Sequence, residues 1–137
     1  MNKSVQPSAA WSFRLAALLC LIALLAHELI GTPMVLAPLH AVDISENVIW
    51  LHHFSWHVGT IVALTLMGMF SYASLRTEGL ILAVVASLVC AAFALLAFAL
   101  AIFGNAVLWT SPAPWVWSLV AMIGGFGVWK ARRAQYV

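Results

Sequence analysis

The stretch LILAVVASLVCAAFALLAFALAIFG, residues 80–104, contains 25 residues without a charged side chain or a proline. An α-helix rises 1.5 Å per residue, so about 20 apolar residues are enough to cross the roughly 30 Å hydrocarbon core of a bilayer. The stretch is longer than this minimum. It therefore predicts a helix that crosses a membrane.

The composition of the whole chain agrees with a membrane protein. Of its 137 residues, 65% are hydrophobic and only 7% are charged, and the mean hydropathy is +1.06. A soluble domain would carry about a quarter charged residues. The formal net charge is only +2, and there is no basic patch with interleaved aromatic residues. These features argue against nucleic-acid binding. The expected partner of the chain is the lipid bilayer.

Three further apolar stretches, at residues 11–31, 46–74 and 112–129, predict three more helices. Their short connections predict antiparallel neighbours. We therefore expect an all-α, four-transmembrane-helix antiparallel bundle that forms one domain over residues 1–137. Asp43 and Glu46 resemble a capping-box start for the second helix. Ser111 and Pro112 are typical of the N-cap and first residue of the fourth.

The positive charges predict the orientation of this bundle. All six Lys and Arg residues lie on one side of the predicted membrane: Lys3, Arg14, Arg76, Lys130, Arg132 and Arg133. The two connections on the other side contain none. Because cytoplasmic connections carry the excess of Lys and Arg, both termini are expected in the cytoplasm. We expect a multi-pass protein of a bacterial-type inner (plasma) membrane.

The first span has an alternative interpretation as a signal peptide. Lys3 and Arg14 precede LAALLCLIALLA, as in the charged and apolar regions of such peptides. The one suitable small-x-small site, residues 35–37, is followed by Pro38, which hinders cleavage. We therefore expect the first helix to be retained.

Small residues recur four apart in the third span, as at Ala83, Ser87 and Ala91. Such faces let membrane helices approach closely, which predicts a tight bundle and offers a surface for a homodimer or a membrane protein partner. Cys20 and Cys90 lie in the middle of apolar runs and match no zinc or redox spacing. We expect both to be packing residues.

The titratable residues gather near one end of the first two spans. Residues 50–57 read WLHHFSWH, and all five histidines of the chain fall between His27 and His57. Counting along the two antiparallel helices places His27 and His57 at nearly the same depth. His53 and His57, four residues apart, share a helix face. A carboxylate within hydrocarbon is costly unless it is paired, so Glu28 should contact a histidine of the second span.

Three chemistries fit this cluster. His27 and His57, or His53 in its place, could be the axial ligands of haem b. His27, Glu28, His53 and His57 could instead hold a bare transition metal ion. Glu28 and a histidine could also exchange protons with a quinol. The alternative is a structural cluster with no cofactor. We expect His40 to be a loop residue.

No complete catalytic pattern is present, so the sequence leaves open whether the protein is an enzyme. The HEL at residues 27–29 lacks the second histidine of an HExxH zinc site. Four spans with histidines paired across helices resemble small membrane cytochromes b in architecture, though not in motif. Two functions follow as expectations: a redox or metal-handling membrane protein with an outer-leaflet His/Glu site, or a non-catalytic accessory or assembly subunit of a membrane complex.

Overall fold

The computed structural model describes residues 5–134, and over this range the chain is helical with no β-strand. Its long helices are α1 (Pro7–Ala26), α3 (Glu46–Leu75), α4 (Leu80–Phe103) and α5 (Ala113–Arg133). Between α1 and α3 lie the π-helical turn η1 (His27–Gly31), the short helix α2 (Thr32–Val35) and the 3₁₀ segment η2 (Ala37–Ala41). Two further 3₁₀ segments are η3 (Thr77–Gly79) and η4 (Ala106–Thr110).

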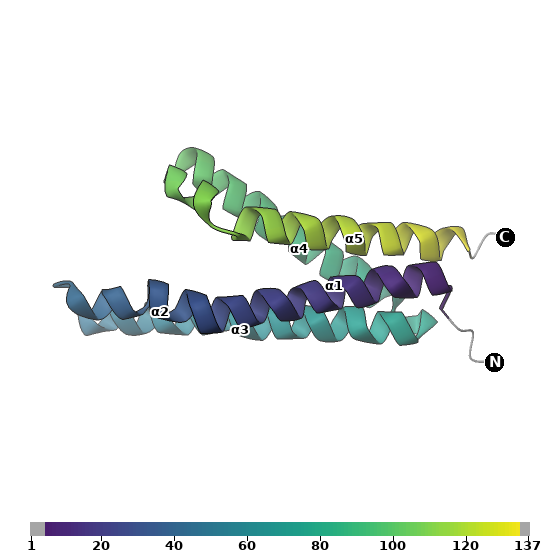
Figure 1. Ribbon diagram of the computed structural model, residues 1–137, viewed down its shortest axis with the longest axis horizontal. Coiled ribbons are helices and arrows are strands. Elements are labelled where there is room, and N and C mark those ends of the chain that lie inside the picture. The colour runs from purple at the N-terminus through teal and green to yellow at the C-terminus, as the bar shows by residue number, and fades with distance from the viewer. Residues whose placement is uncertain (1–4, 135–137) are drawn as a thin grey trace.

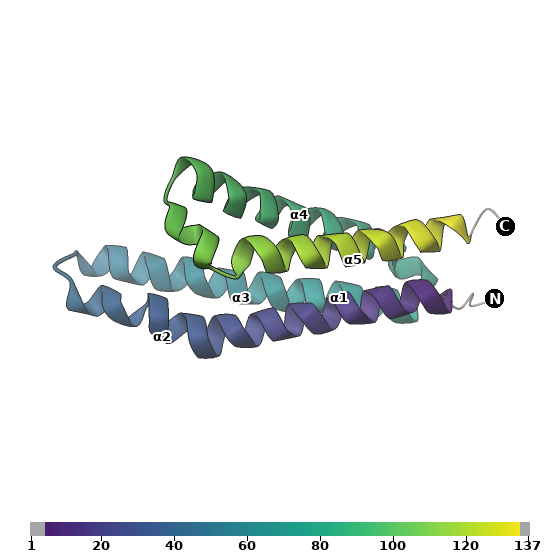
Figure 2. The same ribbon diagram turned by 45° about the horizontal axis from the view of Figure 1, so that its top comes forward.

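The helices form two hairpins of unequal length. One hairpin pairs α1 with α3 and the other pairs α4 with α5, while α1 also packs against α5. The hairpins meet at the end that carries both termini and diverge toward the opposite end, where α3 extends past α4 and α5 (Figures 1 and 2). The bundle is therefore closed at one end and open at the other.

The core occupies the closed end. Its largest side chains are Phe13, Leu66, Phe70 and Val120, each at most 2% exposed. Toward the other end of α3, no residue from 50 to 62 is buried. Most of the apolar surface of this segment thus faces outward, as expected for a helix surrounded by lipid.

Three helical segments have the length and composition of membrane spans: Pro7–Ala41, Glu46–Leu75 and Thr77–Phe103. Helix α5 is 21 residues long but is not among them. Its glycines, its tryptophans and Lys130 lower its mean hydropathy below that of the other three. The chain is thus an all-helical protein with three strongly apolar spans and a fourth, less apolar helix.

Two of the predicted helices match closely, and several predicted ends do not. Residues 46–74 and 80–104 correspond to α3 and α4. The prediction that the first helix stops before Pro33 is wrong, because helical structure continues through the π-turn to Val35. Proline lacks an N–H and clashes with the carbonyl four residues earlier, and the wider π-turn accommodates it without ending the helix.

The predicted capping box is absent, since the N-cap of α3 is Ser45 and makes no side-chain cap bond. The N-cap of α5 is Pro112 and not Ser111.

The small residues of α4 pack inside the bundle. Ala83, Ser87 and Cys90 are buried there, and Gly124 of α5 lies against Ser87 and Phe70. This confirms the predicted close helix packing at Ala83 and Ser87, whereas Ala91 is only partly buried. Cys20 and Cys90 are both free thiols in the core, where they fill space as small side chains.

Replacing Gly124 should destabilise the bundle. A Cβ at this position would lie 2.5 Å from Ser87 Oγ and 2.8 Å from Phe70 Cε1. Phe70 is fully buried and has no room to yield. Gly124→Ala should therefore cost about 1–3 kcal/mol in the free energy of unfolding, measured by titrating SDS into detergent micelles.

Gly125→Ala is the matched control, since a Cβ at Gly125 would meet nothing within 4 Å. Helix propensity favours alanine at both positions, so equal changes in stability for the two variants would contradict the clash with Phe70.

Candidate functional site

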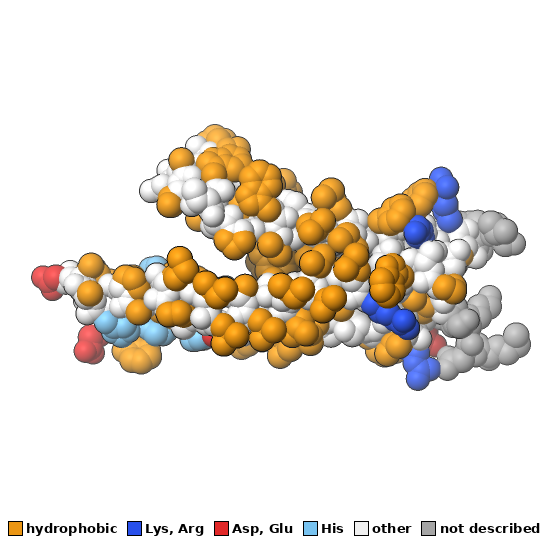
Figure 3. Space-filling model, in the orientation of Figure 1, with side chains coloured by type: hydrophobic (Ala, Val, Ile, Leu, Met, Phe, Trp, Pro, Cys, Tyr) orange, Lys and Arg blue, Asp and Glu red, His pale blue; other side chains and the backbone are white. Residues whose placement is uncertain are grey.

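The polar residues outside the core gather at the far end of the α1–α3 hairpin. We call this part, residues 27–60, the histidine end. Figure 3 shows histidine and acidic side chains there, while Lys and Arg side chains lie at the end that carries the termini. The Lys and Arg side chains of the described residues are thus confined to one end of the bundle, where Glu78 of η3 also lies, and the histidines to the other.

The π-turn η1 shapes the α1 side of the histidine end. Its defining bond runs from the Thr32 N–H to the His27 carbonyl, five residues earlier. Because the turn contains one residue more than an α-helical turn, it rotates the side chains that follow it. Single π-turns inside α-helices occur frequently at functional sites.

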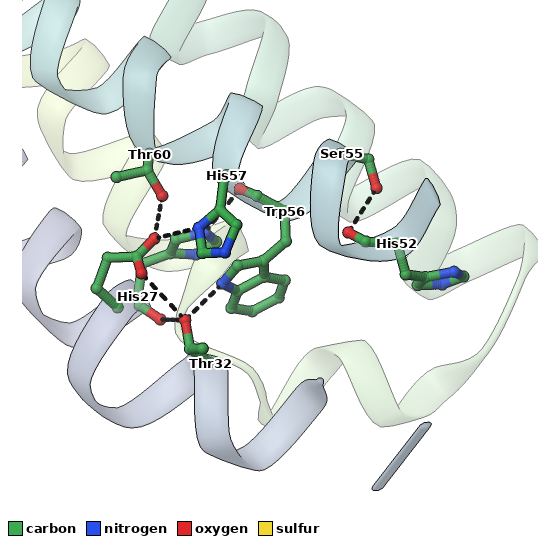
Figure 4. A network of polar contacts seen from close by, with 8 residues as sticks. His27, Thr32, His52, Ser55, Trp56, His57 and Thr60 are labelled. Atoms are coloured by element: carbon green, nitrogen blue, oxygen red, sulfur yellow. Dashed lines mark hydrogen bonds and ion pairs between the residues drawn. The ribbon is translucent and has the colours of Figure 1, made fainter. Parts of the chain in front are cut away.

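Glu28 accepts contacts from both arms of the hairpin, and Figure 4 labels the three donors, Thr32, His57 and Thr60. The Thr60 hydroxyl of α3 donates to Glu28 Oε1, and His57 Nδ1 lies 3.2 Å from the same oxygen. The Thr32 hydroxyl donates to Oε2 over 3.2 Å. The prediction that Glu28 contacts a histidine of the second span is confirmed, and that histidine is His57.

The contact with Glu28 determines how His57 can act. An ionised carboxylate only accepts hydrogen bonds, so Nδ1 of His57 carries the proton. In the neutral ring Nε2 then keeps its lone pair. The side chain is 49% exposed, against 27% for Glu28. Metal-binding histidines in proteins are commonly oriented by a carboxylate in this way.

His27 has a different set of partners. Its ring stacks on Trp56 with 3.9 Å between centroids and 10° between planes. Its Nε2 lies 3.1 Å from the Trp56 carbonyl oxygen, to which it donates. The Trp56 indole N–H in turn donates to Thr32 Oγ1 over 2.9 Å. His27 therefore contacts α3 one residue from His57, as the similar depths of the two histidines predict. Its Nε2, however, is hydrogen-bonded to the Trp56 carbonyl.

Gly31 allows the helices to approach closely at Trp56, whereas a side chain at Gly59 would make only an ordinary contact with His27. A Cβ at Gly31 would lie 2.7 Å from Trp56 Cζ2, and one at Gly59 would lie 3.6 Å from His27 Nε2. The space beside His27 is therefore occupied by the neighbouring helix. A porphyrin between His27 and His57 would require the two helices to separate.

His53 lies one turn from His57, with 6.3 Å between ring centroids. Its Nε2 is 3.2 Å from Nε2 of His40, which η2 carries at the tip of the hairpin. The prediction that His40 is only a loop residue missed this contact. The two residues are 13 apart, and only the shortness of the connection could have indicated it. His52 points away and bonds to the Val48 carbonyl of its own helix.

The predicted ligand set is therefore divided in the structure. Glu28 touches His57, His53 is the neighbour of His57, and His27 faces Trp56. Within residues 5–134, no group of three or more His, Cys, Asp and Glu side chains surrounds a single point at which a metal could sit. Binding of a metal or haem by these residues remains a prediction.

The surface beside His53 and His57 is an open groove on α3. Trp50, Phe54, Val58 and Ile61 line it together with the two imidazoles. Phe54 is 71% exposed and Ile61 64%. Two imidazoles thus stand at the edge of a surface that is otherwise apolar.

Removing the Thr60 hydroxyl should weaken the hairpin. Thr60→Val keeps the shape of the side chain but takes one donor from the Glu28 carboxylate. We expect a loss of about 1 kcal/mol in the free energy of unfolding, since hydrogen bonds to charged groups are among the stronger ones, even in membrane proteins.

Thr65→Val is the control, because the Thr65 hydroxyl bonds only to the Ile61 carbonyl of its own helix. Unchanged stability in Thr60→Val would mean that Glu28 is satisfied without the Thr60 hydroxyl.

Comparison with known proteins adds no relative from which a role could be carried over. No family model matches the chain, and no curated protein or solved structure is significantly similar to it. The chemistry of the histidine end therefore has to be argued from its own side chains.

Proposed function

We propose that this protein crosses a bacterial-type inner membrane four times, with both termini cytoplasmic, and binds a transition metal ion at the outer end of the α1–α3 hairpin. Its role would be redox or metal handling. The gathering of Lys and Arg side chains at the end that carries the termini supports the orientation (Figure 3), because cations favour the cytoplasmic side. The antiparallel packing of α5 on α4 supports a fourth span.

The contact between Glu28 and His57 carries the functional proposal. It holds an imidazole with Nδ1 toward the carboxylate and leaves Nε2 as the free donor atom. The exposure of His57 lets an ion reach that atom. His53 adds a second imidazole on the same helix face. Imidazole and carboxylate groups suit zinc, copper and non-haem iron.

A bare metal ion fits this geometry better than haem b held by His27 and His57. A bis-histidine haem needs two free imidazole nitrogens facing each other across the porphyrin. His27 is stacked on Trp56 and bonded to the Trp56 carbonyl. We therefore place the metal at His53 and His57, with Glu28 orienting His57.

The second candidate function is that of a non-catalytic accessory or assembly subunit. The observation that favours it is the set of contacts that tie α1 to α3 without any ligand. Glu28 with Thr60 and His27 with Trp56 are the clearest of them. In that case the exposed face of α3 would dock a membrane partner.

The topology is tested by single cysteines in a variant lacking Cys20 and Cys90. A cysteine at Asp43 and one at Val107 should both react with a membrane-impermeant maleimide added to intact cells. A cysteine at Thr77 should react only after lysis. Labelling of positions 43 and 107 on opposite sides would show that the chain does not cross four times.

The function is tested by the metal content of the purified protein. The wild type should carry a transition metal, measured by plasma mass spectrometry after metal-replete growth, and His57→Ala should lose most of it. His52→Ala should retain the load, because His52 bonds only within α3.

A dithionite-reduced minus oxidised absorption spectrum of the same samples separates the two cofactors. Sharp low-spin haem bands that vanish in His57→Ala would replace the bare ion with haem b. Absence of both metal and haem from the wild type would leave the accessory role.

A further inference from the structure

We propose that His40 is a ligand of the metal bound at the histidine end, so that His40, His53 and His57 form a three-imidazole site open to the aqueous side. This inference rests on the proposed metal-binding function. It assigns a residue outside the two α3 histidines and indicates how the ion reaches them.

The distance between His40 and His53 carries the inference. Their Nε2 atoms lie 3.2 Å apart, with 5.4 Å between ring centroids. Two imidazoles bound to one tetrahedral ion at about 2.0–2.1 Å would place their nitrogens about 3.3–3.4 Å apart. The pair therefore stands at nearly the separation that a shared metal requires, although the two residues come from different elements. The contact is a hydrogen bond in which one Nε2 carries the proton, so metal binding requires that ring to carry its proton on Nδ1 instead.

His57 lies close enough to provide the third nitrogen. Its ring centroid is 6.3 Å from that of His53, one helical turn away. The three rings do not converge in the structure, so one side chain must rotate to close the site. His57 has room to make that change because half of its side-chain surface is exposed. His53 can turn as well, since its bond to His40 is also exposed.

The position of the site in the fold indicates that the site exchanges its metal ion with the aqueous side and does not store it. His40 lies in η2, at the tip of the longer hairpin and beyond the last residues of α4 (Figures 1 and 2). Three protein ligands leave a fourth position for water or for an incoming donor, the pattern of zinc sites that exchange ligands. A closed structural site would instead supply all four ligands from the chain.

The other polar residues at this end do not replace His40. His27 is engaged with Trp56, and His52 turns back to the Val48 carbonyl. Trp50 lies beside His53, with 5.1 Å between ring centroids, and brings no ligand atom for the ion. His40 is therefore the imidazole best placed to join the pair on α3.

The test is a titration of the full-length protein in detergent with Zn²⁺ in competition with a chromophoric chelator. His40→Ala should raise the dissociation constant at least about 10-fold, as should His53→Ala, while His52→Ala should match the wild type. His40→Cys should restore most of the affinity, because a thiolate also binds zinc. A merely structural His40 would not be rescued by cysteine.

Binding of Co²⁺ provides a second measurement. The wild type should show the intense visible bands of four-coordinate Co²⁺, and His40→Ala should weaken them. Circular dichroism checks that each variant is folded.

The outcomes distinguish the two proposals. Wild-type affinity and Co²⁺ bands in His40→Ala, together with a loss in His57→Ala, would overturn the role of His40 and leave the metal-binding function standing. A wild type that binds neither Zn²⁺ nor Co²⁺ would overturn both.

Discussion

The structure of the histidine end depends on one partly buried carboxylate, that of Glu28. Glu28 lies 14 residues beyond Arg14, and Thr60 lies 16 residues before Arg76. These separations correspond to about 21 and 24 Å along the two helices. In the proposed four-span arrangement Glu28 would lie toward the far boundary of a hydrocarbon core of about 30 Å, where an unpaired charge is costly. Two hydroxyls and an imidazole surround it, and they come from both sides of the hairpin. The need to satisfy one charge thus aligns α1 with α3 and orients His57.

The same requirement separates two kinds of histidine. His57 is oriented by a carboxylate and its side chain is half exposed, whereas His27 is stacked on an aromatic ring and bonded to the backbone. The first arrangement is suited to binding a ligand and the second to holding helices together. The two hypotheses drawn from the sequence therefore describe different residues of one cluster. The proposed ion site would then lie beside a contact that stabilises the hairpin.

Much of the fold could be predicted from the sequence because its signals are local. The ends of α3 and α4 follow from charges and glycines next to long apolar runs. The contact of Glu28 with a histidine also followed, from the cost of an unpaired carboxylate and the matched depth of two antiparallel helices. The π-turn did not, because Pro33 is typical of a helix end and only packing shows that the helix continues. The contact of His40 with His53 depends on how η2 folds over α3, which no local pattern records. The contact of His27 with Trp56 could not be predicted either, since this stacking depends on the close approach of the two helices that Gly31 allows.

The divergence of the two hairpins has a consequence for the surrounding lipid. Near the termini the four helices pack around a common core, so the bundle has a compact cross-section there. Toward the histidine end the hairpins separate (Figure 2), and in a bilayer acyl chains must fill the wedge between them, since vacant volume in an apolar medium is unfavourable. The protein therefore takes up more lateral area in one leaflet than in the other. Because of this tapered shape, a higher lateral pressure in the leaflet around the histidines would push the two hairpins together, and a lower pressure would let them separate.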